Sequence, residues 1–164
     1  MSEENYLYKE KIQSNSTLLL FVVLTIVFLI SGLWRMITYS LDSFAMVLFF
    51  FAAFFLFYSI NYRTLIITIT ADTVLLRFGV FKWETPMQEI MICELDDKLP
   101  NAKKYGGAGI HFMFIEQRYR VSFNFLEHDR VVIRQKGDQK RVKDVSFSTQ
   151  NANEIIRIIK ESLG

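Results

Sequence analysis

Two long stretches without a charged residue dominate the first 62 positions of the chain. No Asp, Glu, Lys or Arg occurs between Lys11 and Arg35, or from Ser43 to Tyr62. The apolar part of each stretch approaches the ~20 residues that a helix needs to cross the hydrocarbon core of a bilayer. Both stretches are apolar on all sides, unlike a helix that packs on a soluble core with one face only. The sequence therefore predicts a transmembrane helical hairpin over residues 17–62.

A buried core helix and a cleaved signal peptide are the alternatives for the first stretch. Three acidic residues, Glu3, Glu4 and Glu10, precede it, whereas a signal peptide begins with a basic segment. Its apolar run, "TLLLFVVLTIVFLISGLW", is also long for the hydrophobic part of a signal peptide. We therefore interpret this stretch as an anchor that stays in the protein.

The distribution of basic residues predicts the orientation of the hairpin. Only seven residues, Arg35 to Leu41, join the two stretches, so both outer ends of the hairpin face the same side of the membrane. Cytoplasmic segments next to spans carry an excess of Lys and Arg. The basic residues that flank the outer ends are Lys9, Lys11, Arg63, Arg77 and Lys82. We expect a multi-pass protein of the cell (inner) membrane with both termini in the cytoplasm, and residues 1–16 as a cytoplasmic N-terminal segment.

Residues 63–164 have the pattern of a separate domain built from short strands. The clearest strand, residues 118–125, alternates an apolar face with a face of Arg120, Ser122 and Asn124, which we expect to be in water. The apolar face, expected in the core, comprises Tyr119, Val121, Phe123 and Phe125. Turn residues such as Gly and Asp separate similar segments elsewhere. The pattern predicts about seven antiparallel strands.

The last residues of the chain predict a helix that packs on this sheet. Asn151 followed by Glu154 resembles a capping box, and a broad apolar stripe follows it. The expected fold class is therefore α+β, with an N-terminal transmembrane α-helical hairpin followed by an antiparallel β-barrel of about seven strands. The C-terminal helix caps this barrel.

Three segments of the chain together point to a known family. They are "YKEKIQSN" before the first apolar stretch, "YGGAGI" in the middle of the domain and "STQNANEI" at the start of the last helix. With these segments the chain resembles the bacterial PH-like domain family, in particular its small membrane-anchored proteins with an N-terminal two-helix hairpin. The middle motif of the family usually reads Tyr-Gly-Gly-Trp-Gly-Ile-Arg, and here Ala108 and His111 replace the Trp and the Arg. The resemblance implies a PH-like barrel over residues 63–164.

The same resemblance implies a function. Membrane-anchored PH-like modules include assembly factors and subunits of larger membrane complexes, although a fold alone does not establish a function. We therefore expect a non-catalytic integral membrane protein whose cytoplasmic PH-like domain acts as a protein-interaction or scaffold module. The expected partners are the lipid bilayer and one protein of unknown identity, and assembly of several copies of the chain is left open.

Three glycines within four residues raise the question of a phosphate site. The segment lacks the Lys and Ser/Thr of a P-loop, and it lies between two strand patterns rather than at the start of a helix. Glycine tolerates positive φ and close backbone approach, which a bulge or sharp bend between strands requires. We therefore expect a structural motif formed by Tyr105, Gly106, Gly107, Gly109 and Ile110.

The sequence shows no motif of catalytic or metal-binding chemistry. A single cysteine, Cys93, excludes an intrachain disulfide and a Cys-based zinc site. The remaining candidate ligands lack the spacing of a metal or acid-base site, and they are Glu94, Asp96, Asp97, His111 and His128. We therefore expect no catalytic residue, no cofactor and no metal, with an enzyme of unrecognised type as a weaker alternative.

The charge of the domain suggests one further contact. Residues 63–164 hold sixteen basic and thirteen acidic residues, too even a balance for nucleic-acid binding. Five basic residues nevertheless cluster around one predicted hairpin, and they are Arg134, Lys136, Lys140, Arg141 and Lys143. In a tethered domain these side chains could touch anionic headgroups. A lipid-headgroup-binding module at the membrane surface is therefore the alternative function.

Overall fold

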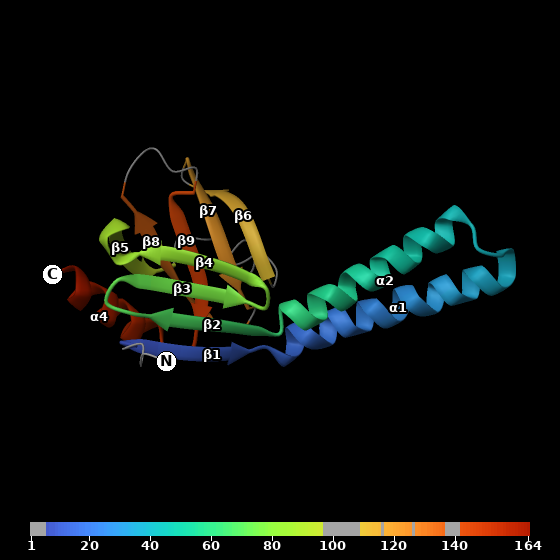
Figure 1. Cartoon of the computed structure of the whole chain (residues 1–164), viewed down its shortest axis with the longest axis horizontal. Helices are drawn as coiled ribbons and strands as arrows, with labels where there is room; N and C mark the ends of the chain where they lie inside the picture. Colours follow the sequence, from blue (N-terminus) through green and yellow to red (C-terminus); the bar gives the residue numbers. More distant parts are fainter. Residues whose placement is uncertain (1–5, 97–108, 116, 126, 137–141) are drawn as a thin grey trace. The chain divides into compact units, whose positions relative to one another are not determined.

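The computed structural model describes residues 6–96, 109–115, 117–125, 127–136 and 142–164. Its contacts divide the chain into two compact units. The helical unit is the continuous segment Ser14–Arg63, whereas the sheet unit combines Met1–Gln13 with Thr64–Gly164. The helical hairpin is therefore an insertion in the sequence of the sheet unit, which takes strands from both sides of it (Figure 1).

The helical unit consists of α1 (Asn15–Tyr39) and α2 (Ser43–Asn61). Each helix begins at a polar cap, where the side chain of Ser14 or Asp42 accepts a hydrogen bond from a backbone N–H of the first turn. At ~1.5 Å per residue the two helices are about 38 Å and 28 Å long. Both helices are long and apolar enough to cross a membrane, in agreement with the sequence prediction.

Aromatic rings and one glycine pack α1 against α2. Phe28 contacts Phe55 with ring centroids 5.4 Å apart, and a Cβ atom added to Gly32 would lie only 3.1 Å from the ring of Phe49. Small residues allow such close approach between helices in membranes. Beside the loop, the guanidinium of Arg35 donates two hydrogen bonds to the carboxylate of Asp42. The capping bonds and the ion pair of this unit thus lie at the ends of the helices.

Sheet A of the sheet unit contains four antiparallel strands in the order β1-β2-β3-β4. These are β1 (Tyr8–Gln13), β2 (Thr64–Ile69), β3 (Thr73–Phe78) and β4 (Phe81–Pro86). The sequence does not predict β1 as a strand, because four of its six residues are polar or charged and only one is aliphatic. That one residue, Ile12, is completely buried and pairs with Leu65 of β2.

Sheet B contains five strands in the order β5-β8-β9-β7-β6. They are β5 (Ile90–Leu95), which follows the short helix η1 (Met87–Glu89), β6 (Gly109–Ile115), β7 (Arg118–Asn124), β8 (Asp129–Gln135) and β9 (Asp144–Thr149). All neighbours are antiparallel except β7 and β9, which pair in parallel. In Figure 1 the strands of sheet A run across those of sheet B at a steep angle.

The α+β class is confirmed, but the expected single closed barrel of seven antiparallel strands is wrong. The described residues form nine strands in two separate sheets, and one pair is parallel. The alternation in the sequence detects strands but contains no information on whether a sheet closes on itself. The expected C-terminal helix is α4 (Ala152–Leu163), which packs against β5 and β8. Asn151 lies at its N-cap but makes no side-chain cap bond, so the predicted capping box is absent.

The core of the sheet unit lies between the two sheets. The ring of Phe78 from sheet A stacks on Phe123 at 6.1 Å and meets the edge of Phe125 at 5.1 Å between centroids. Ile155 and Ile159 of α4 are also completely buried. The two-sheet packing therefore buries Val121, Phe123 and Phe125, three of the residues that the strand pattern predicted as core.

The two faces of β7 differ from the sequence prediction. Arg120, Ser122 and Asn124, which we expected in water, are at most 2% exposed, whereas Tyr119, expected in the core, is 54% exposed. The polar face is buried because its side chains find polar partners. For example, the Ser146 hydroxyl donates to the Ser122 hydroxyl at 2.7 Å. Alternation identified the strand correctly, but it did not identify which face is covered.

Candidate functional site

The most polar cluster inside the sheet unit is a network of buried ion pairs. Arg120 of β7 contacts Asp96 at 2.9 Å and Asp144 at 3.5 Å. Arg130 of β8 lies 3.6 Å from the same Asp96, and Arg118 of β7 lies 2.8 Å from Asp144. Buried charges are tolerated when they are paired in this way, and a guanidinium does not release its proton in a protein. The network therefore joins four strands or strand ends, and its arginines do not transfer a proton.

A second polar cluster connects β1 to sheet B. The carboxylate of Glu10 accepts hydrogen bonds from the Thr149 hydroxyl, from the Gln150 N–H at 2.9 Å and from the Tyr8 hydroxyl at 3.1 Å. Asn151 donates to the same Tyr8 oxygen at 3.2 Å. Burial, with the nearby charge of Glu10, raises the pKa of Tyr8 above its ordinary value. These contacts fasten the strand that precedes the helical hairpin to the end of β9.

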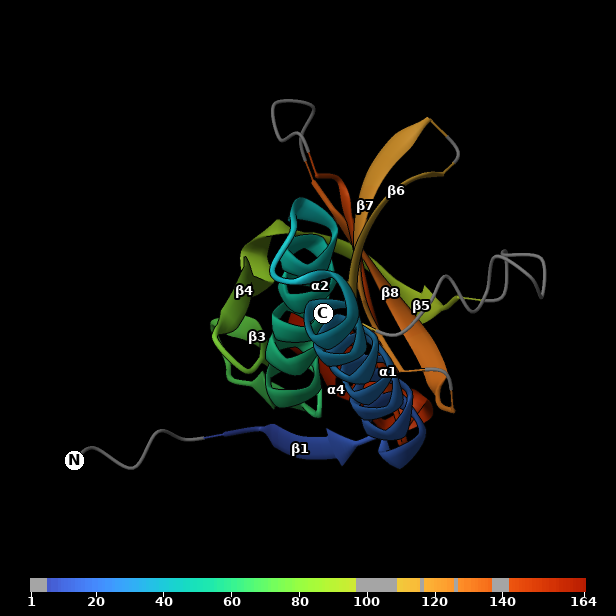
Figure 2. The same ribbon diagram turned by 90° about the vertical axis from the view of Figure 1, so that its right-hand side faces the viewer.

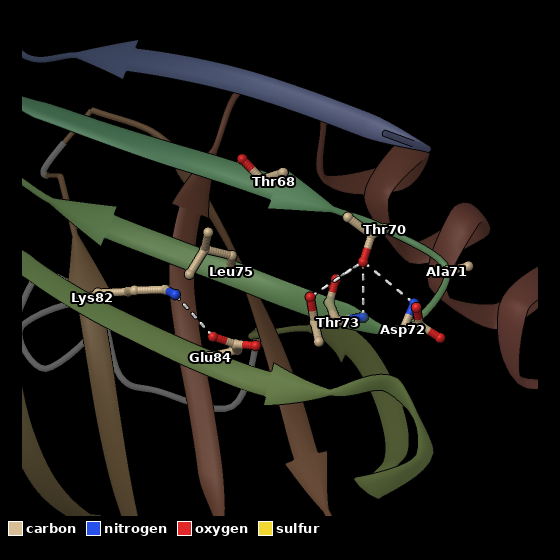
Figure 3. A pocket seen from close by; sticks show the side chains of 8 residues that line it. All are labelled: Thr68, Thr70, Ala71, Asp72, Thr73, Leu75, Lys82 and Glu84. Carbon is tan, nitrogen blue, oxygen red and sulfur yellow. Dashed lines mark hydrogen bonds and ion pairs between the residues drawn. The ribbon is translucent and has the colours of Figure 1, made fainter. Parts of the chain in front are cut away.

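A pocket on the outer face of sheet A has a volume of about 480 Å³. Figure 3 shows that its lining comes from β2, β3, β4 and the turn between β2 and β3. The Thr70 hydroxyl bonds within this turn, and Lys82 pairs with Glu84 at 3.0 Å. Both members of that pair are about half exposed. The polar groups of this pocket are thus satisfied locally, and no pair of them has the geometry of a nucleophile and its base.

The predicted headgroup-contact residues are only partly in the described structure. Arg134 donates to Glu94 at 2.9 Å, and Lys136 donates to the carbonyl oxygen of Gln88 at 3.2 Å. Lys143 precedes β9 and is half-buried, whereas Lys140 and Arg141 lie outside the described residues. Two of the five side chains are therefore engaged within the protein, which weakens the case for this hairpin as a lipid contact.

The glycine motif is also only partly described. Gly109 is the first residue of β6 and has a φ of 110°, a conformation that other residues rarely adopt. Ile110 follows it and pairs with Phe123. Tyr105, Gly106 and Gly107 lie outside the described residues, so the structural role of the whole motif stays a prediction.

Among the described residues, the acidic side chains that we considered as ligands are engaged in separate ion pairs. Glu94 pairs with Arg134, Asp96 pairs with Arg120, and Asp97 lies outside the described residues. Within the described ranges, no group of three or more His, Cys, Asp or Glu side chains is close enough to hold a metal ion.

An exposed apolar surface on the β6–β7 hairpin was not predicted from the sequence. Phe112 is 71% exposed, Phe114 is 61% exposed, and the ring of Tyr119 lies 4.9 Å from that of Phe114. Phe112 pairs with the buried Val121, so these three side chains, named the β6 patch below, share the face of the sheet that elsewhere forms the core. Figure 2 shows the hairpin extending away from β1.

The β6 patch lies beside an open strand edge. Among the described strands, β6 is the last in sheet B and pairs only with β7. Exposed edges that carry apolar side chains are unusual in isolated proteins, because they invite pairing with another chain. The alternation in "IHFMFI" indicates a strand but not that one of its faces is exposed. No family model, curated protein or solved structure matches this chain.

Proposed function

We propose that this chain is a non-catalytic integral membrane protein whose sheet unit binds a protein partner at the β6 patch. The observation that carries the proposal is the coincidence of exposed aromatic residues with an open strand edge. An extended segment of a partner can add a strand to such an edge, and its side chains then cover the exposed rings. Lipid is a poor occupant here, because hydrocarbon cannot satisfy the backbone groups of an edge strand.

The proposed membrane topology rests on two arguments. The basic residues at the outer ends of the hairpin favour cytoplasmic termini. The pairing of β1 with β2 adds that the segments before α1 and after α2 lie on the same side, since they are neighbours in one sheet. Location in the cell (inner) membrane with both termini in the cytoplasm is therefore part of the proposal.

Kinship with the bacterial PH-like domain family also stays a proposal. The C-terminal helix packed on antiparallel strands supports it. The parallel pair β7–β9 and the strand before the hairpin do not belong to the outline that the resemblance implies. A role as scaffold or assembly module follows from the β6 patch without this kinship.

Site-specific photocrosslinking in native membranes tests the proposal. A photoreactive phenylalanine analogue at Phe112 should give an adduct of one discrete mass with another protein. The same analogue at Leu163, an exposed residue at the end of α4, should not give this adduct. Adding Phe114→Ser to the Phe112 variant should reduce its yield.

The mass of the adduct separates the outcomes. An adduct of twice the chain's own mass of 19.3 kDa would mean that the patch joins two copies of this protein instead. Adducts with lipid alone, or equal adducts at both positions, would contradict the proposal.

A further inference from the structure

The chain connects its two units through very short segments. β1 ends at Gln13 and α1 begins at Asn15, whereas α2 ends at Asn61 and β2 begins at Thr64. Three Cα–Cα steps of ~3.8 Å allow at most about 11 Å between Asn61 and Thr64. Gln13 and Thr64 are partners in register. This end of sheet A is therefore the end at which the chain leaves for the helical hairpin and returns from it.

The turn between β3 and β4 lies at the same end of sheet A. Leu65 pairs with Phe78, so Gly79 and Val80, which form the turn, are one strand away from Thr64, about 5 Å in the sheet. The other turn on these strands, between β2 and β3, lies at the far end. It is separated from Thr64 by the length of β2, about 17 Å.

The two turns also differ in chemistry. Val80 at the tip of the near turn is 73% exposed, and Phe81 beside it is 39% exposed. Arg77 and Lys82 form the next cross-strand pair and place two cations behind this apolar tip. The far turn has Ala71 and Asp72 at its tip and therefore an acidic, weakly apolar character.

Arg77 and Lys82, the cations of the near turn, can bind an anionic partner in addition to their contacts within the protein. Lys82 does contact Glu84, but both side chains are about half exposed, and such surface pairs contribute little. Among the described residues, the Arg77 side chain donates one hydrogen bond, to the carbonyl oxygen of Gly79 at 3.2 Å, and this acceptor carries no formal charge that could neutralise the guanidinium. An apolar tip followed by Lys and Arg is the arrangement of segments that enter the headgroup boundary of anionic membranes.

We propose that the β3–β4 turn contacts the anionic lipid surface of the membrane in which α1 and α2 are anchored. The contact rests on the membrane-spanning hairpin of the proposed function, but it is independent of the partner at the β6 patch. Val80 and Phe81 lie among the headgroups, and Arg77 and Lys82 bind lipid phosphates. The contact limits the motion of the sheet unit on its short connections.

Fluorescence quenching of the full chain in lipid vesicles tests this contact. An environment-sensitive probe is attached to Val80→Cys or to the control Ala71→Cys, in a Cys93→Ala background, and the protein is reconstituted into phosphatidylcholine–phosphatidylglycerol vesicles. Lipids with a nitroxide near the headgroup should quench the probe at residue 80 and shift its emission to the blue. Neither change should occur at residue 71. Arg77→Gln with Lys82→Gln should reduce the quenching at residue 80, and added salt should do the same.

Absence of quenching at residue 80, or equal quenching at residues 80 and 71, would overturn the proposal. A probe at Phe50→Cys in α2 distinguishes this from failure of the hairpin itself, since it must be quenched by a nitroxide deep in the acyl chains. Quenching at residue 50 without quenching at residue 80 refutes the turn contact alone. Loss of quenching at residue 50 refutes the spanning hairpin, and the turn proposal with it.

Discussion

The same residue type faces opposite environments in the two units of this protein. In the helical unit, phenylalanines such as Phe50 and Phe44 point outward, and most of the surface of α1 and α2 is apolar. In the sheet unit, Phe78 and Phe147 are completely buried, and even Arg120 is inside. Water drives apolar side chains inward, whereas lipid hydrocarbon does not distinguish them from its own chains. The comparison teaches that α1 and α2 carry the surface expected of membrane spans, whereas the sheet unit has the buried core expected of a fold in water.

The two units also differ in their continuity along the chain. The helical unit is continuous in sequence, but the sheet unit is interrupted by it, because β1 precedes α1 and pairs with β2 beyond α2. The sheet unit can therefore be completed only after both helices have been synthesised. In the proposed topology, its folding depends on the hairpin returning the chain to the side of the membrane on which it started.

Removal of β1 together with the hairpin should destabilise the sheet unit more than any single substitution does. A chain that begins at Thr64 uncovers Leu65 and Ile67 on β2, and it loses the hydrogen bonds of Glu10. We expect it to show no cooperative thermal unfolding by circular dichroism. A variant in which Asn-Gly replaces Ser14–Arg63 should unfold cooperatively, since a two-residue turn can close antiparallel neighbours. Equal midpoints for both chains would show that β1 is dispensable.

Truncation of one buried and one outward phenylalanine should distinguish the environments of the two units. Phe78→Ala removes a completely buried ring and should destabilise the sheet unit by about 3–5 kcal/mol. Phe50→Ala removes an exposed ring of α2 and should change this stability by less than about 0.5 kcal/mol. Denaturant unfolding in mild detergent, followed by Trp83 fluorescence in a Trp34→Phe background, measures both. Similar losses would mean that the two units unfold as one.

Loss of a single charge on β1 should have an intermediate effect. Glu10→Gln weakens the charge-assisted hydrogen bonds from Thr149 and Gln150, which should cost about 1.5–3 kcal/mol. The control Glu84→Gln affects only an exposed pair with Lys82, and we expect a change below about 0.5 kcal/mol. The same unfolding assay applies. If both variants lose equal stability, the Glu10 contacts do not hold β1 in place.

The smallest effect concerns the thiol of Cys93. Burial raises the pKa of Cys93 from 9.0 to about 12. A raised pKa of this kind stabilises the folded protein fully below about pH 9, and the contribution is lost as the pH rises toward 12. At pH 8 iodoacetamide should therefore react slowly with Cys93, but rapidly with Ser40→Cys in the exposed loop between α1 and α2. Equal rates would show that Cys93 is not shielded.

The sequence predicted the helical unit almost completely, because its signal is the absence of charge over two long stretches. It predicted strands and the last helix from alternation and periodicity. It missed β1, whose fold depends on Ile12 and Glu10 meeting residues more than fifty positions away. Local alternation contains no information on such distant partners.

The candidate site was the least predictable part. The basic hairpin was visible in the sequence, but the partners of Arg134 and Lys136 were not. Conversely, "IHFMFI" looks like any core strand, and its exposure follows from the position of β6 at a sheet edge, which only the strand order reveals.

Disulfide cross-linking of β1 to β2 in the membrane-bound chain tests the central claim most directly. Lys11 and Ile66 are partners in register, one on each side of the helical hairpin. In a Cys93→Ala background, Lys11→Cys with Ile66→Cys should form an intramolecular disulfide under mild oxidation, since paired Cα atoms lie within the range that a disulfide spans. The control pair Lys11→Cys with Arg77→Cys is two strands apart and should not form one. Absence of the first disulfide, with both thiols open to alkylation, would contradict a sheet assembled from both sides of the hairpin.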